Sequence, residues 1–385
     1  MKKISAKNIK GKNCLVRIDL NVSYNEENLK LKSSKETIDF LLENGAKKII
    51  LISHFGRPQG EKDNYFDNYL KEESLYIFAD ILKKIYKHKV WFISESIYDP
   101  TFMEVFDSIS EGIVLLENVR FYNENTDLFI EKMSSLGEVF INEAFSVSHR
   151  DSGSVLGLSE VLPSFYGFNL KQEIERIDSF VKKSKNPKML VLGGAKIDEK
   201  LKIGKHFLNQ DYDFLLLGGA LANIVLRYIG FETGISFVGN QAYMVLKNLD
   251  YDKVILPCDF YVLDENGNKA YRLINQIRKS DNILDIGPKS IKLFFDYLKK
   301  AKTVFWNGPL GCVDDEDFDD GTRMFIDELL KLKSNVLIGG GDTLDIVTEF
   351  KNRINRKKNM FISTGGGALL EYLEQGKLKG LKKLE

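Results

Sequence analysis

Residues 335–350 read NVLIGGGDTLDIVTEF, in which a short apolar run is followed by three glycines and then by an amphipathic stretch. The apolar run predicts a buried strand, and the apolar residues at helical spacing after the glycines predict a helix. The same order recurs where NMFIS (359–363) leads into TGGGALLEYLEQG (364–376). A strand, a tight turn and a helix in succession form the repeating unit of a parallel α/β sheet.

This alternation extends over the whole chain. Helical segments such as 35–45 and 72–87 separate the apolar runs. Gly45 ends the segment 35–45 as a helix C-cap would. The runs of the first half are CLVRIDL (14–20), KKIILIS (47–53), VWFIS (90–94), GIVLL (112–116) and EVFIN (138–142), and those of the second half are KMLVL (188–192), DFLLL (213–217), KVIL (253–256), KTVFW (302–306), NVLI (335–338) and NMFIS (359–363). We therefore predict a parallel sheet in each half.

A chain of 385 residues is too long for one ordinary core and fits two domains. The segment LPSFYGFNLKQEIERIDSFVKKSKNP (162–187) has an amphipathic centre, and no Gly/Ser-rich linker occurs, so a connecting helix is the predicted boundary. The prediction is an α/β fold of two doubly wound parallel-sheet (Rossmann-like) domains. Residues 1–165 would form the N-terminal domain, 166–186 the interdomain helix, 187–365 the C-terminal domain and 366–385 a final segment.

The 55 basic residues equal the 55 acidic ones, so the chain has no overall field that would attract nucleic acid or an anionic membrane. No apolar stretch is long enough to cross a bilayer, and no export-type apolar run follows the basic start MKKISAKNIK. Cys14, Cys258 and Cys312 lie far apart and suggest no disulfide framework. We expect a cytoplasmic protein that binds neither nucleic acid nor membrane.

Glycine-bearing turns follow most strands of the second half. They are GGAK (193–196), GGALA (218–222), NGPLG (307–311), GGGDT (339–343) and TGGGA (364–368). At the carboxyl edge of a parallel sheet, such turns let backbone N–H groups and helix N-termini approach a phosphate closely. Any single turn is better explained as a tight connection, but five on one edge favour a phosphate site. Neither GxGxxG nor GxxxxGK[ST] occurs, so the dinucleotide and P-loop signatures are absent.

Charged residues beside these turns strengthen the phosphate hypothesis. Lys196 and Lys200 follow Gly193-Gly194 one helical turn apart, so both can point toward a bound phosphate, although a lysine pair is often only a solvated face. Asp342 follows a glycine triplet, where a carboxylate could hold Mg²⁺ on a nucleotide. Its alternative role is helix N-capping, for which Thr343 is a rival.

Cationic and polar side chains follow the strands of the first half. They are Arg17, Asp19 and Asn21 after the first run, His54 and Arg57 after the second, Arg120 after LLEN, and His149 and Arg150 after EVFIN. A strand-end arginine is often only an ion-pair partner. Four on one edge would repel one another unless a multiply charged anion, or acids such as Glu117 and Glu143, compensated them. Because guanidinium donors suit phosphate and carboxylate oxygens, a small doubly anionic substrate is favoured.

The two halves together predict phosphoryl transfer between a nucleotide and a small acid phosphate that face each other across a cleft. No Ser-His-Asp or Cys-His arrangement is recognisable, and the four histidines do not form a metal-type cluster. A carboxylate acceptor is already ionised and needs no general base. Catalysis would then rest on alignment and on neutralising the charge of the transferring group.

As a set, the motifs resemble the phosphoglycerate kinase family over almost the whole chain. The matching pieces are VRIDLNV (16–22), SHFGRPQG (53–60), LLENVRF (115–121), INEAFSVSHR (141–150), LPSFYGF (162–168), LGGAKIDEK (192–200), GGALAN (218–223), LPCDF (256–260), LDIGPKS (284–290), WNGPLG (306–311), GGGDT (339–343) and STGGGALLEYLEQGKLKGL (363–381). Each piece alone is weak, but a dozen in the family's order is very specific.

The resemblance implies a phosphotransferase with a carboxyl group as acceptor. It would convert ADP and 1,3-bisphosphoglycerate into ATP and 3-phosphoglycerate, a step of glycolysis, with Mg²⁺ as cofactor. It also implies a monomer whose domains close over the cleft by hinge bending. The final segment would pack back on the N-terminal domain.

The resemblance also implies roles for individual residues. Phosphoglycerate would be held by Asp19, Asn21, Lys30, His54, Phe55, Gly56, Arg57, Arg120 and Arg150. The nucleotide would be held by Lys196, Lys200, Ile283, Leu284, Asn307, Asp314, Gly340, Gly341, Asp342 and Thr343, with Ile283 and Leu284 near the base and Asp342 on the metal. The catalytic set around the transferring phosphoryl group would be Lys30, Lys196, Gly341 and Gly365.

The sequence departs from the family at one position that matters for the mechanism. Lys30 stands where the family has an arginine that reaches the transferring group, and Lys32 or Lys35 could be its functional equivalent. Lysine keeps the charge but loses the planar two-pronged contact, which predicts a working but slower enzyme. Smaller departures are Asp314 for a glutamate, Ala220 for a glycine, Glu143 for an aspartate and Ser152 for a histidine.

Two rival functions belong to other classes. A non-catalytic binding relative, which has lost turnover through the change at Lys30, would keep the fold without the activity. A dinucleotide-dependent oxidoreductase would suit the α/β pattern but lacks its fingerprint.

Overall fold

The computed structural model describes residues 2–22, 24, 28–58, 71–239 and 243–384. The chain divides into two compact units, one formed by Met1–Glu175 with Gln375–Glu385 and the other by Arg176–Glu374. Each unit contains a six-stranded sheet, so the predicted α/β fold with two parallel sheets is confirmed. Helix α8 (Phe168–Lys183) leads from the first unit into the second.

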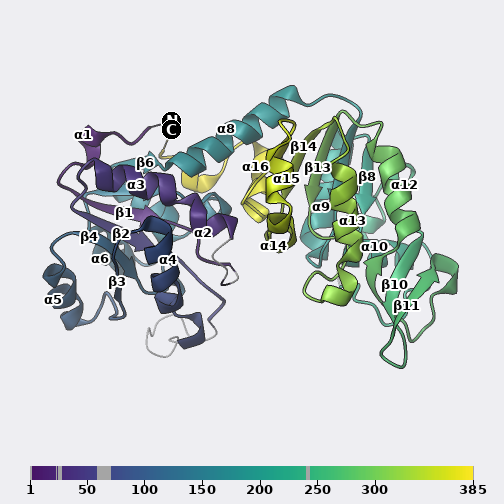
Figure 1. Cartoon of the computed structure of the whole chain (residues 1–385), viewed down its shortest axis with the longest axis horizontal. Helices are drawn as coiled ribbons and strands as arrows, with labels where there is room; N and C mark the ends of the chain where they lie inside the picture. The colour runs from purple at the N-terminus through teal and green to yellow at the C-terminus, as the bar shows by residue number, and fades with distance from the viewer. Residues whose placement is uncertain (1, 23, 25–27, 59–70, 240–242, 385) are drawn as a thin grey trace. The chain divides into compact units, whose positions relative to one another are not determined.

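The sheet of unit 1 has the strand order β3-β4-β2-β1-β5-β6, and each neighbouring pair is parallel. Its strands are β1 (Asn13–Arg17), β2 (Lys48–Ile52), β3 (Val90–Ile93), β4 (Gly112–Leu116), β5 (Val139–Asn142) and β6 (Ser164–Tyr166). Successive side chains point to opposite faces, so Leu15 joins one apolar core and Val16 the other. Helices cover both faces (Figure 1), as a doubly wound sheet requires.

The helices of unit 1 divide between these two cores. Residues of α3 and α4 pack with Val16, whereas residues of α5, α6 and α7 pack with Leu15. The helices are α1 (Ala6–Ile9), α2 (Leu29–Ser33), α3 (Lys35–Glu43), α4 (Ala79–Tyr86), α5 (Pro100–Ser108), α6 (Asp127–Ser134) and α7 (Leu158–Val161). The predicted stop after the 35–45 segment is confirmed, because Gly45 follows α3 with a φ of +76°.

The segment 72–87, predicted to be one helix, is interrupted in its first half. It contains 3₁₀ turns at Lys71–Glu73 and Leu75–Phe78 and becomes α-helical only in α4. The interruption lies at Ser74, whose backbone is extended and whose hydroxyl accepts from the Tyr76 N–H at 3.1 Å. The carboxylate of Glu117 accepts from the Ser74 hydroxyl and from the Leu75 N–H. These hydrogen bonds to Glu117 take the place of the backbone hydrogen bonds that a continuous helix would form at Ser74 and Leu75.

The main sheet of unit 2 has the order β15-β14-β13-β7-β8-β9, again with parallel pairs. Its strands are β7 (Lys188–Leu192), β8 (Phe214–Leu217), β9 (Val254–Ile255), β13 (Thr303–Asn307), β14 (Asn335–Gly339) and β15 (Met360–Ile362). Its helices are α9 (Ile197–Gln210), α10 (Gly219–Tyr228), α11 (Tyr243–Leu246), α12 (Pro288–Leu298), α13 (Asp320–Leu329), α14 (Gly341–Glu349), α15 (Lys351–Asn355) and α16 (Gly367–Gln375). Trp306 of β13 lies in the apolar core on one face of this sheet.

Unit 2 also contains a small antiparallel sheet that the sequence analysis did not predict. Strands β10 (Asp259–Leu263), β11 (Lys269–Leu273) and β12 (Asn282–Ile286) pair in the order β11-β10-β12. A tight turn with Gly267 at a φ of +75° joins β10 to β11. The dipeptide Asn266-Gly267, close after the apolar run FYVL (260–263), is the signal in the sequence that favours a hairpin here.

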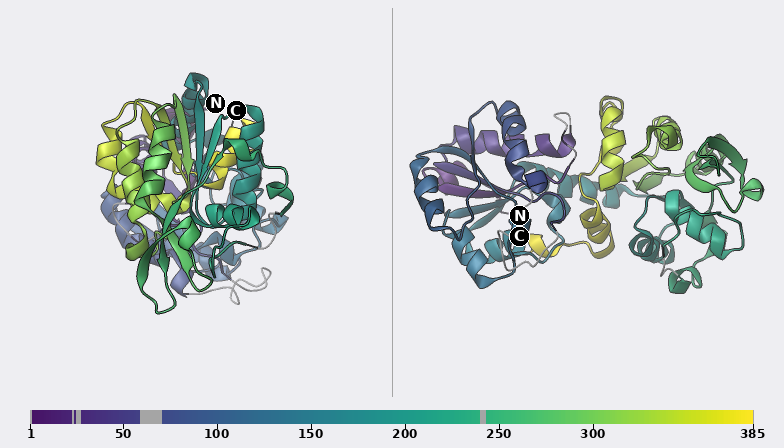
Figure 2. Two further views of the ribbon diagram at one scale, coloured as in Figure 1. Left: turned by 90° about the vertical axis from the view of Figure 1, so that its right-hand side faces the viewer. Right: turned by 90° about the horizontal axis from the view of Figure 1, so that it is seen from below.

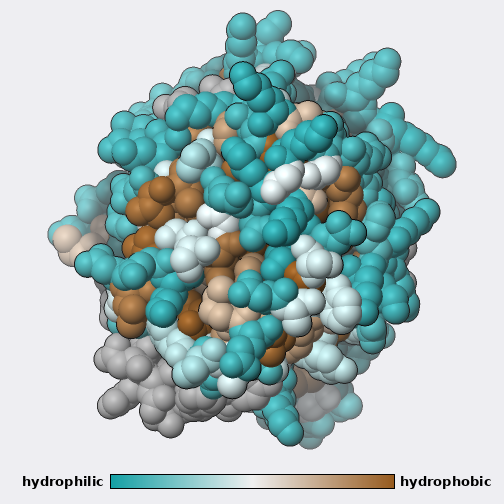
Figure 3. Space-filling model, turned by 90° about the vertical axis from the view of Figure 1, so that its left-hand side faces the viewer, coloured by the Kyte–Doolittle hydropathy of each residue, from teal (hydrophilic) through white to brown (hydrophobic). Residues whose placement is uncertain are grey.

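The two ends of the chain lie side by side in unit 1 (Figures 1 and 2), where the Lys2 N–H donates to the Leu384 carbonyl at 2.9 Å. None of the helices in the described ranges is both long and apolar enough to span a bilayer. The face in Figure 3 is a mosaic in which hydrophilic side chains separate the apolar areas. The exposed large apolar side chains of unit 1 include Tyr76, Trp91 and Met103.

Helix α8 begins against the buried carboxylate of Glu143. The N–H groups of Asn169 and Leu170 donate to this carboxylate at 3.1 and 2.9 Å. Thr37 donates its hydroxyl to Glu143 at 2.5 Å and accepts from the Phe168 N–H at 2.8 Å. These bonds satisfy N–H groups that the first turn of a helix leaves without partners. Burial nevertheless raises the pKa of Glu143 to about 7, against the opposing effect of its hydrogen bonds.

Glu143→Gln removes this ionisable group at nearly constant volume. Between pH 4.5 and about 7 the folded protein keeps the Glu143 proton that the unfolded chain releases. Through this interval Glu143 should therefore cost the wild type about 1.4 kcal/mol of stability per pH unit as pH rises, and the variant should lack this contribution. Calorimetric Tm values measured between pH 4.5 and 7.5 should show the difference between the two proteins moving in favour of the variant as pH rises.

Glu104→Gln, on the exposed surface of α5, is the matched control and should follow the wild-type pH profile. A Tm difference between wild type and Glu143→Gln that is the same at every pH would contradict the assignment of a raised pKa to Glu143.

Candidate active site

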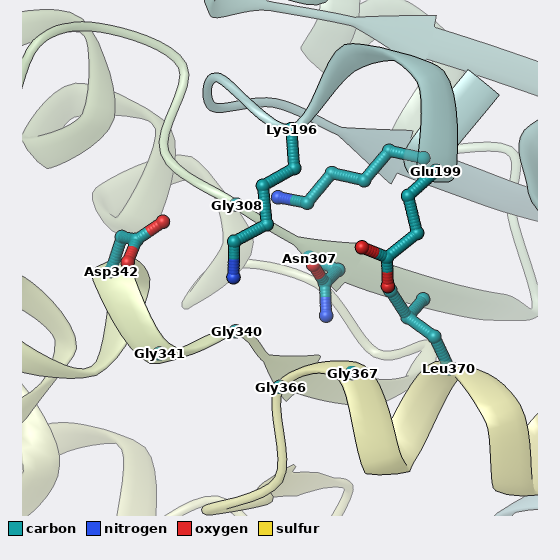
Figure 4. A pocket seen from close by; sticks show the side chains of 11 residues that line it. Lys196, Glu199, Asn307, Gly308, Gly340, Gly341, Asp342, Gly366, Gly367 and Leu370 are labelled. Carbon is teal, nitrogen blue, oxygen red and sulfur yellow. The ribbon is translucent and has the colours of Figure 1, made fainter. Parts of the chain in front are cut away.

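A pocket in unit 2 forms where the turns after several strands of the sheet meet the starts of three helices (Figure 4). Asn307 ends β13, Gly340 follows β14, and Lys196 immediately precedes α9. The residues that line the pocket are Lys196, Glu199, Lys200, Asn307, Gly308, Gly340, Gly341, Asp342, Gly366, Gly367 and Leu370. The sequence-predicted nucleotide residues among them are Lys196, Lys200, Asn307, Gly340, Gly341 and Asp342.

The glycines at this pocket are required by the backbone. Gly340 has a φ of +114° and Gly308 a φ of +96°, conformations that other residues rarely adopt. A Cβ on Gly308 would lie 2.3 Å from Lys200 Nζ, so a side chain there would displace the lysine. The turns therefore present main chain, rather than side chains, to the pocket, and main-chain N–H groups are suitable phosphate donors.

Lys200 is only 5% exposed, and its Nζ donates to the Gly193 carbonyl at 2.7 Å. Burial lowers the pKa of Lys200 to about 8, and the nearby charge of Asp342 limits the decrease. Lys196 extends into the pocket between Asp342 and Asn307 (Figure 4). The two lysines come from the start of one helix, as their spacing predicts.

Asp342 lies in the first turn of α14, on the surface of the pocket. The alternative prediction of N-capping was wrong for both candidates, because the N-cap is Gly340 and no side chain of the described residues caps α14. Thr343 is buried, and its hydroxyl accepts from the Gly308 N–H at 3.0 Å, which ties the turn after β13 to the start of α14. Asp342 therefore remains available to the pocket.

Two further features of the pocket concern Asn307 and Glu199. Asn307 is 1% exposed, and its Nδ2 has no hydrogen-bond partner within the described part of the chain, so a buried donor lies beside the pocket unsatisfied. Glu199 and Leu370 were not predicted. Glu199 follows Lys196 by three positions on α9, so the same helical spacing that selected the lysines would have found it.

Other predicted nucleotide residues lie outside this pocket. Ile283 and Leu284 belong to β12, and the Leu284 carbonyl accepts from the Cys312 N–H at 2.8 Å, close in sequence to the exposed Asp314. Gly365 directly precedes the lining residue Gly366, and its N–H donates to the Ser363 hydroxyl.

Cations gather at the carboxyl edge of the sheet in unit 1. Arg17 ends β1, His54 follows β2, and Arg120 lies in the turn Val119–Phe121 after β4. Burial, together with the charges of Arg150, Arg17 and Arg57, lowers the pKa of Arg120 to about 10. The mutual repulsion expected from the sequence is therefore present.

Arg17 is 2% exposed and contacts His54, with 3.1 Å between its Nη2 and His54 Nδ1. Because guanidinium nitrogens only donate, Nδ1 must accept, and a neutral His54 carries its proton on Nε2. Burial, followed by the charge of Arg17, holds the pKa of His54 well below its usual value. The sequence analysis names Arg17 as a strand-end cation but not as a site residue, since its contact with His54 depends on the pairing of β1 with β2.

Asp19 is a buried acid within this cationic cluster. Lys30 Nζ lies 2.9 Å from Asp19 Oδ2, the Asn21 N–H donates to Oδ1 at 2.9 Å, and the Ser146 hydroxyl also donates to the carboxylate. Burial alone would raise the pKa of Asp19, but the charge of Lys30, helped by the hydrogen bond from Ser146, outweighs this effect and the pKa is strongly lowered. Lys35 instead pairs with Asp39 along α3.

The remaining predicted residues lie in neighbouring loops. The Gly56 N–H donates to Asn21 Oδ1 at 3.0 Å, and the Arg120 guanidinium donates to the Gly56 carbonyl. Phe55 is half-buried, and Arg57 and Arg150 are exposed. Eight of the nine predicted acid-site residues thus come from loops or turns at one edge of the unit 1 sheet, and Lys30 comes from α2 and pairs with Asp19 at that edge.

Comparisons of the sequence with known proteins all find the same family. The model of the phosphoglycerate kinase family matches residues 4–377. The phosphoglycerate kinase of Coprothermobacter proteolyticus is 36% identical over 391 residues, which cover 98% of this chain and 96% of the relative. That of Finegoldia magna is 34% identical over 392 residues, with 97% and 96% covered.

Solved structures agree. Phosphoglycerate kinase from Pyrococcus horikoshii OT3 has a TM-score of 0.82 at 26% identity and covers 100% of this chain and 98% of its own. The enzyme from Coxiella burnetii has a TM-score of 0.72 at 28% identity, with 98% and 97% covered. The chain therefore belongs to the phosphoglycerate kinase family and is a phosphotransferase.

Proposed function

We propose that the pocket of unit 2 binds the nucleotide and that the cationic cluster of unit 1 binds phosphoglycerate. The family reaction is the reversible transfer of a phosphoryl group from 1,3-bisphosphoglycerate to ADP, which yields ATP and 3-phosphoglycerate. The observation that carries the proposal is that one chain contains both kinds of anion site, each at the carboxyl edge of its own parallel sheet.

The nucleotide assignment is supported by the composition of the pocket. Lys196 and Lys200 supply charge, the turns at Gly340 and Gly366 supply main-chain donors, and Asn307 supplies an unsatisfied amide among the described residues. The phosphate chain of a nucleotide could pair with the lysine charges and accept hydrogen bonds from the main-chain donors and the Asn307 amide. Ile283, Leu284 and Asp314 lie away from the pocket and would take the base and ribose.

Mg²⁺ is proposed to reach this pocket together with the nucleotide. No cluster of three or more His, Cys, Asp or Glu side chains in the described ranges has the geometry of a metal site. Asp342, exposed on the pocket surface, offers one carboxylate. This donor set fits Mg²⁺, which commonly keeps one or two protein carboxylates and takes its other ligands from phosphates and water. Bound there, the ion would neutralise phosphate charge.

The acid-site assignment is supported by the density of cations in unit 1. Arg57, Arg120 and Arg150 can offer forked donors to phosphate or carboxylate oxygens. His54, held neutral with its proton on Nε2, is suited to donate a hydrogen bond rather than to accept a proton. Asn21 and the Lys30–Asp19 pair would border the same substrate, and Phe55 and Gly56 would supply the loop.

For transfer, the two anions must meet in line, with water excluded. Because the proposed sites belong to different units, we infer a hinge motion that brings them together. The attacking carboxylate or phosphate oxygen is already ionised and needs no base. Lys30 and Lys196, with the N–H groups near Gly341 and Gly365, would stabilise the charge on the phosphoryl group in flight.

A coupled assay with 3-phosphoglycerate and Mg-ATP tests the proposal. We expect turnover that depends on both substrates and stops when a chelator removes Mg²⁺. Binding of both substrates without turnover would instead support a non-catalytic relative. A monomeric state, a cytoplasmic location and the lack of nucleic-acid or membrane binding stay predictions, and gel filtration with light scattering would test the first of them.

Lys30→Arg should raise kcat, because a guanidinium can make the two-pronged contact that lysine cannot. We expect an increase of about twofold to tenfold. Lys35→Arg is the control, since Lys35 pairs with Asp39 on α3, and it should leave kcat unchanged. Steady-state kinetics with both substrates saturating would decide. An unchanged or lower kcat for Lys30→Arg would show that Lys30 is not the residue that reaches the phosphoryl group.

Nucleotide affinity should fall with rising pH above about 8, the pKa to which burial lowers Lys200. A nucleotide phosphate favours charged lysine, so Kd for Mg-ADP should rise by up to about tenfold per pH unit beyond that point. Lys200→Arg keeps its charge and should flatten the profile, whereas Lys196→Arg retains Lys200 and should not. Titration calorimetry from pH 7 to 9.5 measures this, and a flat wild-type profile would contradict it.

A further inference from the structure

Asn118 is a fully buried residue shortly after β4, and it was not among the predicted site residues. Its Oδ1 accepts from the Phe55 N–H at 3.2 Å and from the Arg120 N–H at 3.1 Å. Its Nδ2 donates to the Phe55 carbonyl at 2.7 Å and to the Glu73 carbonyl at 2.9 Å. A primary amide offers two donors and two acceptor lone pairs, so Asn118 uses its full capacity.

These four bonds join segments that are distant in the sequence. Phe55 is held through both its N–H and its carbonyl, much as a neighbouring strand would hold it. The loop at 54–57 has no regular secondary structure of its own, so the Asn118 amide replaces the pairing that the loop lacks. The same amide caps the turn that carries Arg120. The positions of the loop and of Arg120 are therefore fixed to each other by one side chain.

The carboxylates of Glu117 and Glu73 also hold the segments that Asn118 joins. The buried Glu117 carboxylate accepts from the Asn118 N–H at 2.7 Å, the Leu75 N–H at 2.8 Å and the Ser74 hydroxyl at 2.6 Å. Glu73 Oε1 accepts from the Arg57 N–H at 2.6 Å. The residues that follow β4 thus anchor both the loop at 54–57 and the segment at 73–75.

Electrostatics make such an anchor necessary. Arg57, Arg120 and Arg150 repel one another, as the lowered pKa of Arg120 reflects. A loop without regular structure would relax away from this repulsion when no anion is bound. A neutral amide can hold the loop without cancelling the charge that the substrate needs, whereas a carboxylate in the same place would compete with the substrate.

We propose that Asn118 is a positioning residue of the acid-substrate site, which holds the 54–57 loop and Arg120 ready for phosphoglycerate without touching it. This inference rests on the proposed assignment of that site to phosphoglycerate. An ordinary structural asparagine would affect stability alone, so the test compares ligand affinity with stability.

Asn118→Ser separates the two roles. Serine is a good cap and can still accept from the Arg120 N–H, but it is too short to reach Phe55. Asn118→Ala removes both functions. Titration calorimetry on the full chain should show Kd for 3-phosphoglycerate rising by about tenfold or more in both variants, while Kd for Mg-ADP changes less than about twofold. The serine variant should lose less thermal stability than the alanine variant.

Lys48→Met is the matched control for loss of a buried hydrogen bond in unit 1. Lys48 Nζ donates to the Phe106 carbonyl at 2.7 Å, at the amino end of β2 and so at the opposite edge of the sheet. This variant should lower the Tm and leave both Kd values unchanged.

The outcomes distinguish the positioning role of Asn118 from the assignment of the site to phosphoglycerate. If Arg57→Ala fails to weaken 3-phosphoglycerate binding, the proposed site itself is wrong. If Arg57→Ala weakens binding but Asn118→Ser and Asn118→Ala bind as the wild type does, the positioning role of Asn118 is overturned and the site stands. Equal loss of affinity for both ligands in the Asn118 variants would also overturn it, since that would indicate general destabilisation.

Discussion

Parallel strand pairing is the constraint on which the rest of the structure depends. In each six-stranded sheet every neighbouring pair is parallel, so the carboxyl ends of all its strands meet at one edge. Parallel connections also require helices on the sheet faces, which bury the strands and leave that edge to the loops. Residues as distant as Arg17 and Arg120, or Lys196 and Asp342, are brought together by this geometry alone.

The two proposed anion sites rely on different physical means. In unit 2 the turns are rich in glycine, so main-chain N–H groups and helix starts approach the pocket, with buried Lys200 adding charge. In unit 1 the loops carry guanidinium groups, which supply strong forked bonds but repel one another. That repulsion must be balanced before any substrate arrives, and Asp19 balances part of it through its ion pair with Lys30.

Buried acids and amides at strand ends organise the loops of unit 1. Glu117 holds the segment at 73–75, Glu143 holds the start of α8, and Asn118 holds the loop at 54–57. Each satisfies backbone groups of a neighbouring segment that lacks its own regular partners. Burying a carboxylate for this purpose raises its pKa, as Glu143 illustrates, so the architecture near the proposed acid site is sensitive to pH.

Local pattern by itself determined the parallel α/β class, most of the strands, the glycine turns and the helix starts that carry Lys196, Lys200 and Asp342. It did so because the period of apolar residues and the positions of glycines determine secondary structure over a few neighbouring residues. The segment 72–87, the capping of α14 and the contacts of Arg17 and Asn118 were decided only by the tertiary structure. Each depends on a partner from another strand, such as Glu117 for Ser74 or His54 for Arg17, and the identity of that partner follows from strand order, which no local period encodes.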